Sequence, residues 1–73
     1  MIKDKEVARH VSEVLLRCGA EINNSIRHVK ENCSDEELEM YKQAMGVVMG
    51  EILLKGLNPI YSQHPDIKPE ELQ

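Results

Sequence analysis

Residues 44–57 read AMGVVMGEILLKGL, a stretch that is apolar around nearly the whole circumference of a helix. A chain of 73 residues has too little interior to bury such a helix on every side. The simplest way to cover the stretch is a partner, and the simplest partner is a second copy of the same chain. We therefore expect the chain to associate with itself through this part of the sequence.

The first helix is predicted over residues 4–32. Apolar side chains recur at helical spacing from Val7 to Cys33 and fill a stripe roughly 120° wide, the pattern of a single buried face. Gly, Asn and Ser residues between positions 19 and 25 lower the helix propensity and would permit a break. Because the apolar positions on both sides stay in phase, we expect one continuous helix.

The second helix is predicted over residues 35–55. Ser34 followed three residues later by Glu37 is the pattern of a capping box, which marks a helix start. A lysine followed by Gly56 is typical of a helix end, and Pro59 supports a stop there.

With a turn of about two residues between them, the helices should pack as an antiparallel hairpin. The sequence therefore predicts an all-α fold in which residues 1–57 form the hairpin and two copies build a homodimeric four-helix bundle. Residues 58–73 contain three prolines and show no helical period. They are predicted to form an extended C-terminal tail, packed on the bundle or disordered.

Three glycines mark the expected contact. Counted outward from the turn, Gly19, Gly46 and Gly50 lie at a similar height in the hairpin. Glycine inside a helix costs about 1 kcal/mol relative to alanine, so three at one level indicate a close helix crossing, within the hairpin or between two copies. Room for a small ligand is the alternative interpretation. The candidate interface residues are these glycines together with Val47, Met49, Leu53 and Leu54.

Cys18 and Cys33 are expected to be reduced and buried. On a continuous helix they would lie more than ~20 Å apart, too far for a disulfide. Both fall on the apolar stripe, where a thiol acts as a small hydrophobic group.

A short polar edge beside the apolar stripe is a candidate site. Cys18 adjoins Glu21, Ser25 and His28 there, at helical spacing. A carboxylate and a histidine at a buried edge can mark a functional site. Polar groups in such a position can instead set the register of two packed helices.

Charge argues against two classes of partner. The net charge is −4, with +2 on residues 1–30 and −6 on residues 31–73. An acidic chain without a basic run is poorly suited to nucleic acid or to an anionic membrane, and we expect neither as a partner. The charged start and the lack of a long apolar segment predict a cytoplasmic protein.

No motif in the sequence carries known chemistry. It contains no Cys-x-x-Cys, His-x-x-x-His or Glu-x-x-His spacing, no nucleophile elbow and no phosphate-binding glycine loop. We therefore expect no catalytic residue, metal or cofactor. The predicted function is a homodimeric protein-interaction or adaptor module, which binds an unidentified protein through the acidic start of the second helix or through the tail. A dimer that binds a small ligand or a metal is the alternative.

Overall fold

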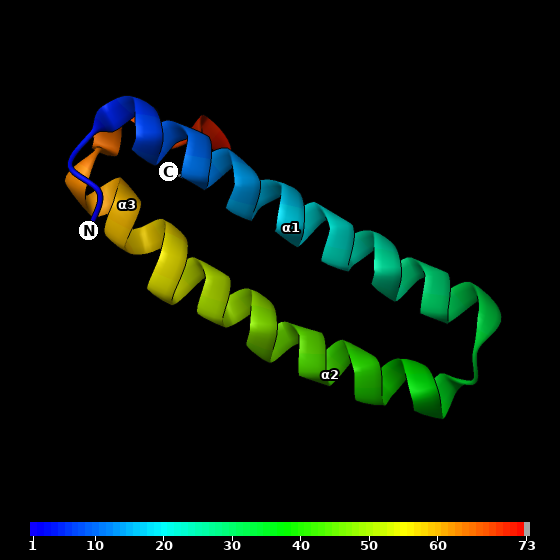
Figure 1. Ribbon diagram of the computed structural model, residues 1–73. Coiled ribbons are helices and arrows are strands. Elements are labelled where there is room, and N and C mark those ends of the chain that lie inside the picture. The colour runs from blue at the N-terminus through cyan, green and yellow to red at the C-terminus, as the bar shows by residue number, and fades with distance from the viewer. Residues whose placement is uncertain (73) are drawn as a thin grey trace.

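The computed structural model describes residues 1–72 as a hairpin of two long helical arms (Figure 1). The first arm is α1 (Lys5–Asn32), which runs without a break. The second begins as α2 (Asp35–Glu51) and passes through the π-helical segment η1 (Ile52–Leu57) directly into α3 (Asn58–Gln63). No strand occurs in the described part of the chain. The predicted all-α hairpin is confirmed.

Side chains cap both arms. The carboxylate of Asp4 accepts a hydrogen bond from the Val7 amide at 3.0 Å and so begins α1. The predicted capping box begins α2: the Glu37 amide donates to Ser34 Oγ, and the Ser34 amide donates to Glu37 Oε1, each at 3.1 Å. The hydrogen bonds from the backbone and side chain of Ser34 lower the pKa of Glu37 below its usual range.

The predicted helix end at Gly56 and Pro59 is wrong, because the second arm continues through both residues. Pro59 has no amide hydrogen, and its ring would clash with the carbonyl of Lys55 in a regular helix. The π-helical turn η1 removes the conflict because its backbone hydrogen bonds span five residues in place of four. The Asn58 amide, for example, donates to the Leu53 carbonyl five residues back. Gly56 lies inside this turn, and the chain needs no left-handed glycine there.

The arm continues past Pro59 because the segment beyond it buries apolar side chains. The buried core consists of Ala8, Leu57, Ile60 and Tyr61, which join the start of α1 to η1 and α3. All four lie at the end of the hairpin that holds the two termini (Figure 1). In contrast, no residue of α2 is buried. The hairpin therefore has a core at one end and two uncovered helices over the rest of its length.

Hydrogen bonds and apolar packing hold the N-terminus against this core. The Met1 amino group donates to Gln63 Oε1 at 2.9 Å, and His64 Nε2 donates to the Ile2 carbonyl oxygen at 2.7 Å. Ile2 packs against the buried cluster.

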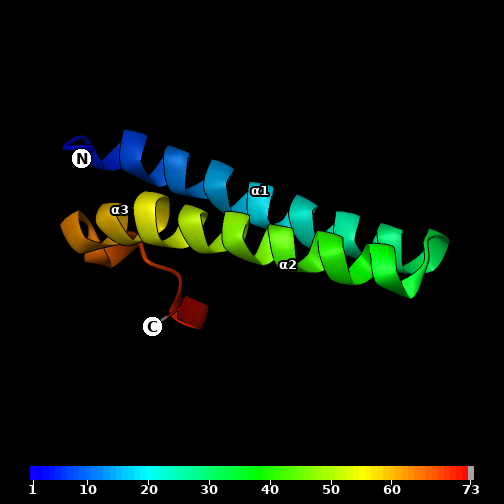
Figure 2. The same cartoon turned by 90° about the horizontal axis from the view of Figure 1, so that it is seen from below.

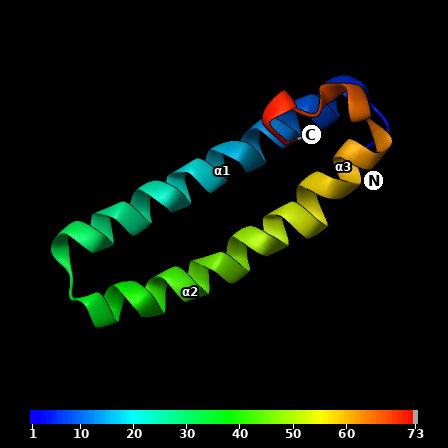
Figure 3. The same ribbon diagram turned by 180° about the vertical axis from the view of Figure 1, so that it is seen from behind.

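The segment predicted as an extended tail is also largely helical, which corrects the sequence interpretation. After α3 it forms two 3₁₀ turns, η2 (Pro65–Ile67) and η3 (Glu70–Leu72). An ion pair between Lys5 and Asp66 ties it to α1, and Ile67 packs against the core. Figures 2 and 3 show that it lies off the plane of the two arms, on the side of one broad face, over the first half of α1.

The molecule is a thin rod of 44 × 19 × 16 Å. Within residues 1–72, no helix combines the length and the apolar character that crossing a bilayer requires.

Candidate docking surfaces

One broad face of the hairpin carries an open apolar groove between the two arms, with a volume of about 570 Å³. We call this surface the groove face. Nine of its ten lining residues have apolar side chains or none, and Asn23 is the exception. The lining residues are Leu15, Leu16, Gly19, Ala20, Asn23, Met49, Gly50, Ile52, Leu53 and Leu57.

Small residues keep the groove open. A Cβ atom added to Gly19 or Gly50 would meet no atom within 4 Å outside its own helix backbone, and Gly46 is equally unobstructed. These glycines therefore do not mark a close crossing inside the hairpin. Gly19 and Gly50 line the groove, whereas Gly46 is exposed outside it. The close approach within the hairpin occurs instead at Gly56, where an added Cβ would lie 2.9 Å from Leu15 Cδ1.

The C-terminal segment lies on the same side of α1 as the groove. Lys5, Leu16, Asn23 and Lys30 are separated by 11, 7 and 7 residues, spacings that return to one side of a helix. Lys5 holds Asp66 of the C-terminal segment, while Leu16 and Asn23 line the groove. Figure 3 shows the C-terminal segment over the first half of α1, so it lies toward the terminal end of the face that carries the groove.

A basic hollow flanks the groove at its other end, toward the turn. Arg27, Lys30 and Lys42 line it together with Asn23, Ile26 and Leu38, and its volume is about 480 Å³. None of the three cations has an ion-pair partner within residues 1–72. We call this hollow, with its three cations, the basic hollow.

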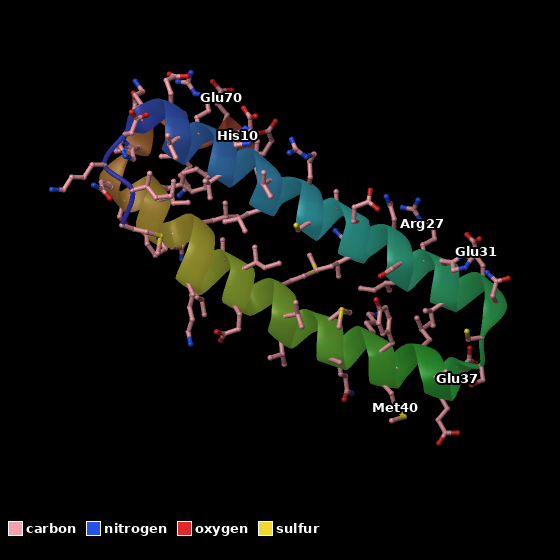
Figure 4. All side chains as sticks on the ribbon, viewed as in Figure 1. His10, Arg27, Glu31, Glu37, Met40 and Glu70 are labelled. Carbon is pink, nitrogen blue, oxygen red and sulfur yellow. The ribbon has the colours of Figure 1, made fainter. Side chains whose placement is uncertain are left out.

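A second apolar surface lies on the back of α2. Met40, Val47 and Leu54 are 71%, 69% and 62% exposed, and they follow one another at intervals of seven residues. Figure 4 shows Met40 pointing away from α1. Because positions seven apart share a helix face, Val47 and Leu54 point away from α1 as well. We call these three residues the outer stripe.

The interface residues predicted from the sequence therefore divide between two surfaces. Met49 and Leu53, with Gly19 and Gly50, line the groove. Val47 and Leu54 belong to the outer stripe. The two groups could not be separated from the sequence, because residues 44–57 are apolar on both sides.

The sequence interpretation missed Leu16, Ala20 and Asn23 as parts of the groove wall. They are spaced by four and then three residues, so they lie in one row on α1, along an edge of the apolar stripe. This spacing could have indicated that the row packs against another helix. Alanine and asparagine do not stand out by hydrophobicity, which is why the stripe appeared narrower than it is.

The polar edge of α1 does not assemble into one site. Ser25 Oγ donates to the Ile22 carbonyl at 2.7 Å, so the Tyr41 hydroxyl, 2.6 Å away, donates to Ser25. His28 Nδ1 accepts from the Asn32 side-chain amide at 3.3 Å. Glu21 is exposed and joins neither pair. The Ser25–Tyr41 bond connects the two arms, which is a structural role.

The prediction that both cysteines are buried is wrong, because both thiols are free and exposed. Cys18 lies at an edge of the stripe that a two-helix hairpin has no further layer to cover. Cys33 is the C-cap of α1, in the turn. Within residues 1–72, no group of three or more His, Cys, Asp or Glu side chains is arranged to hold a metal ion.

No protein-family model, curated protein or solved structure matches this chain.

Proposed function

We propose that the protein is a homodimeric protein-interaction module, in which two hairpins pack groove face against groove face as an antiparallel four-helix bundle. The observation that carries this proposal is the exposed area. A monomeric protein of 8.3 kDa is expected to expose about 4,600 Å². This chain exposes 5383 Å², an excess of about 800 Å². Each partner in a standard protein interface buries about that much.

The shape of the rod supports the same stoichiometry. The radius of gyration of the chain is 14.6 Å, whereas a compact domain of its length is expected to have about 11 Å. A compact body of twice this length has an expected radius of gyration of about 14.6 Å. Two rods lying side by side would therefore have a radius of gyration close to that of a compact domain, whereas the radius of one rod is too large for its length.

The charges on the groove face favour a second copy in antiparallel orientation. The basic hollow of Arg27, Lys30 and Lys42 flanks the groove toward the turn, and the exposed carboxylates of Glu70 and Glu71 lie toward the termini. Antiparallel pairing brings each basic hollow next to the acidic segment of the other copy. Parallel pairing would place like charges together, which opposes association.

The apolar walls favour a helix as occupant of the groove over a small ligand. Its volume lies within the usual range for ligand sites, but such sites also present several convergent polar groups. In this groove Asn23 supplies the one polar side chain. Packed helices need small residues and apolar side chains, which the groove supplies through Gly19, Ala20 and Gly50.

Ala20→Glu with the matched control Asn24→Glu tests the proposal. Both residues are exposed on α1, but Ala20 lines the groove and Asn24 does not. For a dimer, the melting temperature rises with protein concentration. We expect this dependence in the wild type and in Asn24→Glu, and its loss in Ala20→Glu. An unchanged concentration dependence in Ala20→Glu would overturn the assignment of the groove face.

A further inference from the structure

The outer stripe remains uncovered after the proposed pairing. Met40, Val47 and Leu54 point to the side of α2 opposite α1, whereas the groove opens on a broad face between the arms. A row of large apolar side chains, each more than three-fifths exposed, is costly to leave in water. Covering the stripe would therefore be favourable, whether or not the groove pairs two copies.

The shape of the stripe fits a helix. Gln43 and Gly50 stand between the three apolar residues, so that the line steps by 3, 4, 3 and 4 residues. This is the spacing by which one helix packs along another. Gly50, which also lines the groove, marks the border between the stripe and the groove face.

The charges beside the stripe define the partner. Glu36 lies one turn before Met40, and Glu39 is adjacent to it. Both carboxylates are exposed and have no ion-pair partner in the part of the chain that the structure describes. They favour lysine or arginine on the helix that docks there.

A second copy of α2 does not supply those cations. In parallel orientation, Glu36 and Glu39 of the two copies would lie side by side and repel. In antiparallel orientation they would lie near the end of the second arm, where Lys55 is already bound to Glu51 at 3.1 Å. We propose that the outer stripe binds an amphipathic helix of another protein, with an apolar seam bordered by lysine or arginine.

A labelled synthetic helix tests this proposal on the full-length protein. The probe is a peptide of about three heptads with leucine at the two seam positions and lysine at the two flanking positions of each heptad. A control peptide carries glutamate in place of every lysine. Fluorescence anisotropy then gives the affinity of each peptide for the wild type, for Val47→Ser and for the control Val7→Ser, which alters a half-exposed valine on α1.

We expect the lysine peptide to bind the wild type at least tenfold more tightly than the glutamate peptide. Val47→Ser should weaken that binding about tenfold, since it removes apolar contact area, and Val7→Ser should leave it unchanged. A combined Glu36→Gln and Glu39→Gln variant should weaken it severalfold and reduce its dependence on salt. No binding of either peptide, equal binding of both, or equal effects of Val47→Ser and Val7→Ser would overturn the proposal. A fall of Val47→Ser to half the wild-type mass would also overturn it, because the stripe would then join two copies.

Discussion

Gly56 lies directly against Leu15 of the first arm: a Cβ atom added to Gly56 would lie 2.9 Å from Leu15 Cδ1. Gly56 lies in the π-helical turn, and Leu15 packs against the buried core. The missing side chain at Gly56 therefore leaves room for Leu15 to pack between the two arms.

Gly56→Val should destabilise the protein by about 1–3 kcal/mol, since a branched side chain would force Leu15 out of its packing position. Gly46→Ala should instead stabilise it by about 0.5–1 kcal/mol, because that position is helical and has open space around it. Urea unfolding of the two variants and the wild type measures both effects. Equal stability of Gly56→Val and the wild type would show that the approach is looser than described.

The two tyrosines should respond in opposite ways to loss of their hydroxyl groups. The Tyr61 hydroxyl is buried and has no hydrogen-bond partner within residues 1–72. Tyr61→Phe should therefore leave stability unchanged or raise it by up to about 1 kcal/mol. Tyr41→Phe should lower it by about 0.5–1.5 kcal/mol, because it breaks the bond to Ser25 that joins the arms. Thermal unfolding of the two variants tests the pair, and a larger loss in Tyr61→Phe would contradict it.

Acid should weaken the capping box of α2. Because the folded protein lowers the pKa of Glu37, the cap contributes fully above the ordinary value of 4.5 and is lost as the pH falls through the lowered value. Unfolding free energies measured between pH 7 and pH 3 should therefore fall less in Glu37→Gln than in the wild type. Glu36→Gln, at a neighbouring exposed position outside the cap, is the control and should keep the wild-type slope. Matching slopes in Glu37→Gln and the wild type would contradict the cap assignment.

Acid should also loosen the C-terminal segment. A hydrogen bond from Lys5 lowers the pKa of Asp66, so their contact is present above the ordinary value of 3.8 and weakens as the pH falls below it. Asp66→Asn should speed amide hydrogen exchange in η2 at neutral pH, since it removes the ion pair that ties the segment to α1. Unchanged exchange in η2 would contradict this role of the ion pair.

The parts of the fold that depend on local patterns could be predicted from the sequence. The periodicity of α1 and the capping box at Ser34 both depend on residues three or four positions apart, and both helices begin where those patterns place them. The continuation past Pro59 could not be predicted in this way, because local rules favour a stop. It depends on the burial of Ile60 and Tyr61 against α1, a tertiary contact between residues far apart in the sequence.

The candidate site was only partly predictable for a related reason. An apolar stretch indicates that a helix has apolar surface to cover. It does not show which of its residues face one partner and which face another. Met49 and Val47 are two residues apart, yet one lines the groove and the other belongs to the outer stripe. The exposure of Cys18 has the same origin, since the stripe on α1 is wider than a single opposing helix can cover.

The mass of the wild-type protein in solution tests the central claim most directly. Sedimentation equilibrium at micromolar concentration and moderate salt should give about 16.6 kDa, twice the chain mass of 8.3 kDa. High salt should shift the equilibrium toward the monomer, because the basic hollow and the acidic C-terminal segment would then attract each other less. A mass of 8.3 kDa at all concentrations, with the helical fold intact, would contradict the account.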